Sequence, residues 1–159
     1  MNSFTPKNFS ETSRMILDLV SELERRSRGG KAFSIILLCL NEHCSPEILL
    51  KSFQSVTRIF DDIYVYNERR NEYLLSLKHC DTKGAFRFIT RLKNAIKKED
   101  VFQNPFEAVV AEPVEGDDIP KLLKLVEEDL EKILKEGSGE MGEYKDISPL
   151  KRYVDQLKK

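Results

Sequence analysis

The stretch YVYNERRNEYLLSLKHCD, residues Tyr64–Asp81, decides the fold of this 159-residue chain. Ile63 and Val65 alternate with tyrosines ahead of a polar segment, and the alternation resumes after it in YLLSL. Apolar residues with a period of two on both sides of a short polar segment predict a β-hairpin. The turn carries Arg69 and Arg70 where glycine or asparagine would bend the chain more easily. What these arginines do depends on what the fold brings beside them.

Helix and strand patterns flank the hairpin in a regular order. The run FSIILLCLN is apolar on both faces, which is typical of a central strand covered on both sides. The helices are expected from their apolar spacing, their capping residues and the glycines that follow them. Before the hairpin we expect a helix at Phe9–Arg28, with a capping box from Asn8 and Glu11 and a stop at Gly29-Gly30, a strand at Phe33–Asn41, and a helix from Ser45 to near Asp61. After it we expect a helix from Asp81 or Thr82 with the stripe Phe86, Ile89, Leu92 and Ile96, a strand at Phe106–Glu112, a turn at Gly116-Asp117, and a helix at Asp118–Glu136 ended by Gly137.

This order predicts an α+β fold, with an antiparallel sheet built on a βαββαβ core of the ferredoxin-like or nucleotide cyclase-like kind. One helix leads the core and further helices follow it. The first and third strands of such a core are antiparallel neighbours. The end of the strand 33–41 should therefore lie beside the Arg69-Arg70 turn. We expect residues 1–137 to form one domain, and residues 138–159 to be a linker and a C-terminal tail helix.

Composition narrows the range of partners. The chain has 26 basic and 27 acidic residues, a formal net charge of −1, so no overall field favours nucleic acid or an anionic membrane. The longest apolar run, Ala32–Leu40, is far shorter than the about 20 residues that span a bilayer. The N-terminus is polar and lacks a signal-peptide pattern, and the three cysteines suit reduced thiols. We expect a cytoplasmic protein that binds no nucleic acid and does not insert into membranes.

The element order and the hairpin turn resemble the GGDEF domain, the diguanylate cyclase fold of bacterial signalling. RRNEY, from Arg69 to Tyr73, occupies the five positions of the Gly-Gly-Asp-Glu-Phe signature. Only Glu72 is kept, while Asn71 and Tyr73 are near substitutions. The resemblance covers roughly Phe4 to Gly137 and depends more on the order of elements than on single residues.

The departures from the family pattern imply a degenerate domain. In the family the turn glycines let the backbone approach the substrate's phosphates, which the side chains of Arg69 and Arg70 should obstruct. The family also holds magnesium with aspartates at the end of the first strand, where this chain has Cys39 and Asn41. Glu72 alone remains as a charged ligand candidate, and one carboxylate cannot hold two metal ions. We therefore expect no catalytic residue, no metal, no cofactor and no enzyme activity.

The segment Arg58-Ile59-Phe60-Asp61 matches the family's inhibitory Arg-x-x-Asp site, although its distance to the signature is about two residues longer than in the family. The plainer interpretation is that Arg58 complements a helix C-terminus and Asp61 begins a turn. Both interpretations stay open.

Two functional hypotheses follow. The first is a non-catalytic bacterial signalling or scaffold module that binds a partner protein or a second copy through the hairpin, the C-terminal helix or a self-association face. Arginine suits such interfaces because its planar donors pair with carboxylates. The alternative is a receptor for cyclic di-GMP or another nucleotide, in which Arg58, Arg69 or Arg70 would bind phosphate.

Overall fold

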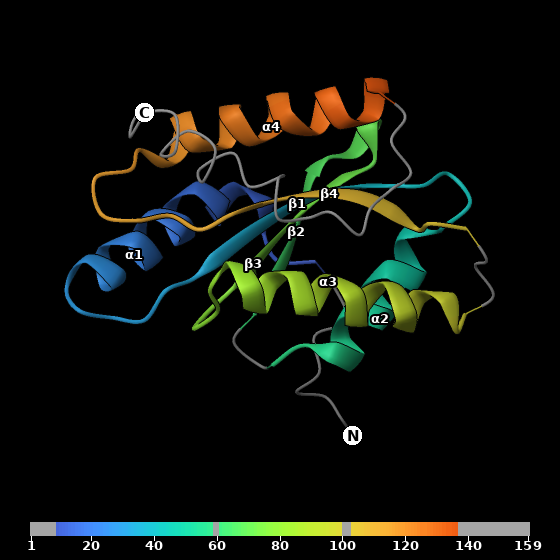
Figure 1. The fold of residues 1–159 in the computed structure, drawn as a ribbon, viewed down its shortest axis with the longest axis horizontal. Coiled ribbons are helices and arrows are strands. Elements are labelled where there is room, and N and C mark those ends of the chain that lie inside the picture. Colours follow the sequence, from blue (N-terminus) through green and yellow to red (C-terminus); the bar gives the residue numbers. More distant parts are fainter. Residues whose placement is uncertain (1–8, 59–60, 100–102, 137–159) are drawn as a thin grey trace.

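The computed structural model describes residues 9–58, 61–99 and 103–136, which form a four-stranded sheet between two pairs of helices (Figure 1). Along the chain lie a 3₁₀ turn at Thr12–Arg14, α1 Met15–Ser27, β1 Ser34–Leu40, α2 Pro46–Val56, β2 Asp62–Asn67, a 3₁₀ turn η2 at Glu68–Arg70, β3 Glu72–Leu77, α3 Thr82–Lys97, β4 Phe106–Ala111 and α4 Ile119–Glu136. The strand order is β2-β3-β1-β4, and every neighbouring pair is antiparallel. The predicted α+β class, the antiparallel sheet and the pairing of the first and third strands are confirmed.

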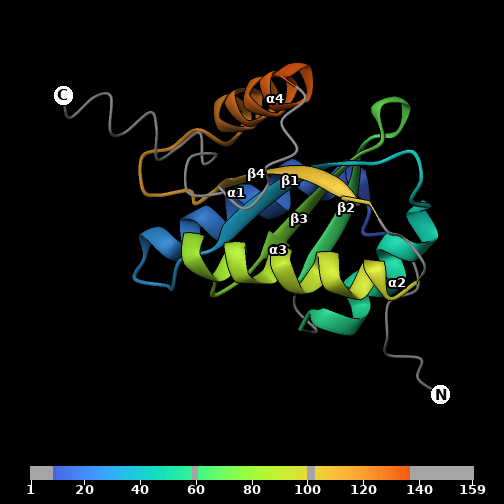
Figure 2. The same ribbon diagram turned by 45° about the vertical axis from the view of Figure 1, so that its right-hand side comes forward.

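Each face of the sheet has its own apolar core. Ile36, Leu38 and Leu40 of β1 pack in the cluster that includes α2 and α3, whereas Ile35 and Leu37 pack in the cluster that includes α1 and α4. Figure 2 shows α3 and α4 on opposite sides of the sheet. Because successive side chains of a strand point to opposite faces, a central strand between two cores must be apolar throughout. This explains the unbroken SIILLCL run of β1.

Helix α1 begins later than its sequence pattern predicts. It starts at Met15 rather than at Phe9, and no side chain caps its first turn. Glu11 does not cap the helix as the predicted capping box requires, and Asn8 lies outside the described residues. Ser10 instead forms a bridge to Tyr64, with its backbone N donating to the Ile63 carbonyl at 2.8 Å. The chain therefore first extends along the edge strand β2 and turns into the helix afterwards, and the helix ends before Gly29, whose φ is +95°.

Helix α2 begins as predicted and ends early. The Ser45 side chain accepts a hydrogen bond from the backbone N of Ile48, and Pro46 stands in the first turn. The helix ends at Val56 rather than near Asp61. The physical reason is that Thr57 is extended and that the Asp61 carboxylate accepts a hydrogen bond from the backbone N of Arg58 at 3.2 Å, which holds a turn instead of a helix.

The hairpin and the helix after it agree with the sequence. β2 and β3 pair across η2, and Asp81 caps α3 by accepting a hydrogen bond from the backbone N of Gly84 at 2.8 Å. The buried stripe of α3 keeps Ile89, Leu92 and Ile96, but Phe86 is only partly buried, and Ala85, Phe88 and Lys93 are buried as well. β4 ends at Ala111, one residue before the predicted end.

The C-terminal part follows the prediction as far as it is described. Gly116 has a φ of +96° in the turn before α4, which accounts for a glycine at that point. Gly137 and the predicted linker and tail helix at 138–159 lie outside the described residues, so that part of the domain division stays a prediction. Among the helices of the described ranges, none is long and apolar enough to cross a membrane.

Candidate functional site

The first candidate site is the corner where the end of β1 meets the hairpin turn. In the register of β1 and β3, Cys39 stands opposite Glu72. The backbone N of Leu40 donates to the Asn71 carbonyl at 2.8 Å, and Asn71 Nδ2 donates to the Leu40 carbonyl at 3.1 Å. These bonds fix the turn against the end of β1, where the sequence predicted it to lie.

Asn71 makes the turn compatible with two arginines. Its φ is 60°, in the left-handed region that asparagine tolerates better than most residues. Asn67 Oδ1 accepts a hydrogen bond from the backbone N of Arg70 at 3.3 Å, which closes the 3₁₀ turn before it. Since one asparagine supplies the positive φ, Arg69 and Arg70 need no glycine-like conformation.

Arg70 is tied to carboxylates on two elements. Its Nε lies 3.6 Å from Glu72 Oε2, and its Nη2 lies 3.7 Å from Glu131 Oε2 on α4. Its carbonyl also accepts a hydrogen bond from Cys39 Sγ at 3.4 Å. Arg69 is exposed and forms no hydrogen bond or ion pair with any residue that the structure describes. The two arginines therefore differ, because Arg70 is held in the corner and Arg69 projects from it.

Burial controls the protonation of the corner. Glu72 is 5% exposed, and this burial raises its pKa, with Arg70 opposing the shift and Glu127 and Glu131 reinforcing it. Tyr66 donates a hydrogen bond from its hydroxyl to Glu127, and burial raises the pKa of Tyr66. The hairpin is thus joined to α4 through two side-chain contacts, one ionic and one from a neutral phenol.

The end of β1 presents neutral groups. Burial, followed by the charge of Glu72, raises the pKa of Cys39, so this thiol is neutral at pH 7 and a poor nucleophile or metal ligand. Asn41 is engaged in the loop, because its Nδ2 donates to the Asn104 carbonyl at 3.3 Å and its Oδ1 accepts from the backbone N of His43 at 2.9 Å. Within residues 9–58, 61–99 and 103–136, no group of three or more His, Cys, Asp or Glu side chains could hold a metal ion.

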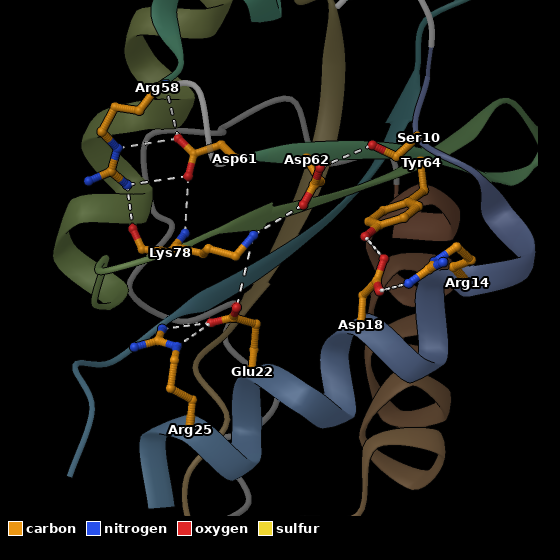
Figure 3. Close-up of polar contacts among 10 residues, drawn as sticks. All are labelled: Ser10, Arg14, Asp18, Glu22, Arg25, Arg58, Asp61, Asp62, Tyr64 and Lys78. Carbon is orange, nitrogen blue, oxygen red and sulfur yellow. Dashed lines mark hydrogen bonds and ion pairs between the residues drawn. The ribbon is translucent and has the colours of Figure 1, made fainter. Parts of the chain in front are cut away.

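The second candidate site lies where α2 leads into β2. Asp61 Oδ2 lies 3.3 Å from Arg58 Nε, and Asp61 Oδ1 accepts from the backbone N of Lys78 at 3.1 Å (Figure 3). Arg58 also donates to the Lys78 carbonyl, and Lys78 Nζ lies 3.2 Å from Asp62 and 3.9 Å from Glu22. The carboxylate of Asp61 is 2% exposed, whereas the Arg58 side chain is 47% exposed. Asp61 therefore anchors and orients an arginine that still faces solvent.

Arg58 faces a pocket of about 460 Å³ that is rich in cations. Arg87 and Arg91 of α3 line the same pocket, together with His79 and Cys80 after β3. Burial raises the pKa of Cys80 to about 11, so this thiol is uncharged at neutral pH. Three guanidinium groups around one polar pocket could bind the phosphate or carboxylate groups of a ligand.

The structure separates the arginines that the sequence proposed as ligand-binding residues. Arg58 precedes β2 and the Arg69-Arg70 pair follows it, so the strand of six residues, about 20 Å long, lies between them. Arg58 instead lines one pocket with Arg87 and Arg91, which the sequence analysis did not predict as site residues. Their i, i+4 spacing on the helix directly after the hairpin was the available signal, because it places both on one helix face.

A search of the solved structures finds the same architecture in diguanylate cyclase domains. The active GGEEF domain of a diguanylate cyclase from Vibrio cholerae has a TM-score of 0.68 at 18% identity, over 82% of this chain and 94% of that one. The chain has the fold of a GGDEF domain.

Two further GGDEF structures from Pseudomonas aeruginosa agree. The FimX GGDEF domain has a TM-score of 0.67 at 11% identity, over 87% of this chain and 96% of that one. The diguanylate cyclase SiaD, in complex with its activator SiaC, has a TM-score of 0.66 at 15% identity over 86% of this chain. The chain spans 58% of the SiaD chain. No protein-family model matches the sequence, and no curated protein matches it.

Within the GGDEF fold, the two candidate sites occupy distinct places. The corner with Arg70 and Glu72 is the hairpin turn on which the sequence resemblance depends, beside the end of β1. The pocket with Arg58 lies at the other end of β2, between the loop after α2 and the exposed side of α3. The two sites can therefore be tested by separate substitutions.

Proposed function

We propose that this chain is a non-catalytic signalling module with the GGDEF fold, which acts by binding a partner rather than by making a nucleotide. The observation that carries the proposal is the ion pair between Arg70 and Glu72. Glu72 is the single carboxylate of the signature positions Arg69 to Tyr73, and it is 5% exposed and paired with the neighbouring Arg70. A metal ion at this point would have to displace the guanidinium and would meet an uncharged thiol at Cys39.

The metal ligands that phosphoryl transfer from a nucleoside triphosphate requires also support a non-catalytic function. Two hard cations that bridge phosphates need several carboxylate oxygens, because Mg²⁺ is bound through hard oxygen ligands and orients both the attacking and the leaving oxygen. Glu127 and Glu131 of α4 carry negative charge nearby, but they are engaged by Tyr66 and Arg70. The groups that could replace the missing aspartates are thus used to join the hairpin to α4.

The test is release of pyrophosphate from GTP with Mg²⁺, with the active Vibrio cholerae GGEEF domain as positive control. We expect the chain to give no more product than its own Glu72→Gln variant. Product formation above that background would overturn the proposal.

A second candidate function is a receptor for cyclic di-GMP or a related dinucleotide, favoured by the pocket of Arg58, Arg87 and Arg91. The pocket combines three cations with a volume of about 460 Å³, and phosphates pair well with guanidinium groups. The GGDEF domain of DgcB from Caulobacter crescentus, with a TM-score of 0.66, was solved in complex with c-di-GMP. The fixed position of Arg58 on Asp61 would reduce the entropy that a phosphate contact must overcome.

Calorimetry with cyclic di-GMP tests this candidate. We expect binding that is lost or weakened at least about tenfold by Arg58→Ala or Arg91→Ala, since each removes a charge-assisted contact. Arg69→Ala is the matched control, because Arg69 is exposed at the far end of β2. No heat with the unmodified chain would contradict the receptor function, and an equal loss in the control would contradict the pocket of Arg58 as its site.

A further inference from the structure

Helix α3 carries an unusual one-sided charge. Its sixteen residues, TKGAFRFITRLKNAIK, contain no acidic residue and five basic ones. Lys93 is buried, whereas the other four are exposed, and a further exposed lysine follows the helix: Lys83, Arg87, Arg91, Lys97 and Lys98. The chain as a whole has a net charge of −1, so this concentration of cations is local.

The arrangement is unfavourable within the folded chain. Lys83, Arg87 and Arg91 are spaced at i, i+4, and like charges at that spacing cost roughly 0.2–0.5 kcal/mol per pair. Neither Arg87 nor Arg91 forms an ion pair with any described residue, and Lys98 forms none either. Arg91 Cζ lies 5.8 Å from the ring centroid of Phe88. Asp81 and Glu99 line the same pockets but form no ion pair with Arg87, Arg91 or Lys98, so the repulsion along α3 is compensated only in part, which points to an anionic partner.

The exposed cations of α3 border two adjoining pockets, which together are called the α2–α3 groove. A second pocket, of about 530 Å³, adjoins the pocket of Arg58, and the two share Val56 and Arg91. Lys98 lines this second pocket together with Lys51, whose Nζ lies 3.3 Å from Glu99 Oε1 in the same pocket, and Ser55 and Asn94 add hydrogen-bonding groups. The groove runs along α3 from Gly84 to Lys98, about 21 Å at 1.5 Å per residue.

We propose that the α2–α3 groove binds an acidic, extended peptide segment of a partner protein. The inference rests on the proposed function as a partner-binding module and names the chemistry of the partner. A groove of about 21 Å accommodates roughly six extended residues at about 3.3 Å each. Carboxylates at alternate positions would meet Arg87, Arg91 and Lys98 in turn, and Asn94 and Ser55 can bond the peptide backbone.

Two other anionic partners fit the groove less well. Single-stranded nucleic acid binds through aromatic stacking as well as charge, and Phe88, the aromatic side chain of the two pockets, is 3% exposed. A membrane surface needs apolar side chains beside the cations. The exposed large apolar residues of the described chain lie on α1 and α4, not on α2 or α3: Ile16, Leu17, Leu125 and Leu134.

Fluorescence anisotropy with a labelled Glu-Ala-Glu-Ala-Glu-Ala-Glu peptide tests the inference. We expect binding that weakens as salt is added, with the Gln-Ala counterpart binding at least about tenfold less tightly. Arg91→Glu and Lys98→Glu should each weaken binding of the acidic peptide about tenfold or more. Lys124→Glu on α4 is the matched control, because Lys124 is an exposed lysine of a helix outside the groove.

Thermal unfolding accompanies each variant. The reversal at Arg91 relieves its repulsion with Arg87, so we expect a midpoint that equals or exceeds that of the unmodified chain. Lys98→Glu places a negative charge beside Glu99 at the C-terminal end of α3 and should lower the midpoint slightly. A tenfold loss of binding at an unchanged midpoint supports the groove. No binding of the acidic peptide, equal binding of the glutamine peptide, equal loss in Lys124→Glu, or tighter binding of a ten-residue oligo-dT or of phosphatidylserine vesicles would overturn it.

The outcomes separate this inference from the proposed function. Pyrophosphate release from GTP would contradict the absence of catalysis without affecting the peptide result. Absence of both pyrophosphate release and peptide binding would agree with the proposed function and would contradict binding of an acidic peptide in the groove. If cyclic di-GMP binds, Arg58→Ala should weaken the dinucleotide and Lys98→Glu the peptide, because these residues line different pockets.

Discussion

Lys93, the buried cation of α3, gives the most direct test of how burial affects a charged side chain in this fold. Its side chain lies on the buried side of α3, the residue is 9% exposed, and Nζ lies 5.0 Å from the ring centroid of Phe106. Burial lowers the pKa of Lys93 from 10.5 to about 8, against the attraction of Glu107. At about 1.4 kcal/mol per pH unit, this difference corresponds to at most about 3 kcal/mol against the charged form at neutral pH.

We therefore expect Lys93→Met to raise the free energy of unfolding by about 1–3 kcal/mol at pH 7. The lower end allows for the lost attraction of Glu107 and for the lost cation–π contact with Phe106, which methionine partly replaces by packing its sulfur on the ring.

The pH dependence has a definite sign. Unfolded Lys93 keeps its proton up to about pH 10.5, whereas the folded side chain releases it near pH 8. Between these values the unfolded state binds more protons, so the unmodified chain gains stability relative to the variant as pH rises. The advantage of the variant is greatest below pH 8 and disappears near pH 10.5.

Urea unfolding at pH 7, 8, 9 and 10, followed by circular dichroism, measures the difference. Lys83→Met, at an exposed position of the same helix, should change stability by no more than about 0.5 kcal/mol. A Lys93→Met variant that is less stable at pH 7, or a difference that stays constant from pH 7 to 10, would refute the reasoning.

Three further substitutions test the contacts that position the sites, each measured by urea unfolding. Tyr64→Phe should lower the free energy of unfolding by about 1–2 kcal/mol, because the buried hydroxyl donates to Asp18 at 2.9 Å; an unchanged value would contradict a structural role for that bond. Asn71→Ala should cost about 1–2 kcal/mol at a φ of 60°, and Asn71→Gly less; the reverse order would show that the left-handed conformation is not the limiting feature. Asp61→Ala should lower the free energy of unfolding by about 2–4 kcal/mol, because it leaves the backbone N–H groups of Arg58 and Lys78 without their acceptor. A loss below about 1 kcal/mol would contradict a structural role for the Asp61 carboxylate.

The sequence predicted the elements because their patterns are local. The period-two alternation around Arg69 and Arg70, the apolar β1 run and the Ser45 cap each depend on neighbouring residues, and each appears in the structure. The start of α1 differs because a distant partner decides it, whereas the early end of α2 depends on the nearby contact of Asp61 with the backbone N of Arg58. The start of α1 is set by the bond from Ser10 to Ile63, which is separated from it by more than fifty residues.

The candidate sites could be predicted from the sequence only where strand pairing places them. The corner of Cys39 and Glu72 followed from the antiparallel pairing of the first and third strands. The partner of Arg70 on α4, Glu131, did not, because a mixed-charge helix gives no indication of which carboxylate faces the hairpin. Arg58 and Asp61 were proposed as ligand-binding residues, whereas Arg87 and Arg91 were missed because they belong to a later helix and meet Arg58 only in the folded chain.

The contact between Ser10 and the edge strand has a mechanical consequence. The backbone N of Ser10 bonds the Ile63 carbonyl at 2.8 Å, and its Oγ donates to Asp62 Oδ1 at 3.1 Å. A pull on the chain ahead of Ser10 would be transmitted to β2 before it reaches the first turn of α1. Since β2 leads into the turn of Arg69 through a single register shift between Val65 and Asn67, tension or rotation applied from upstream would shift the far end of the hairpin relative to α4.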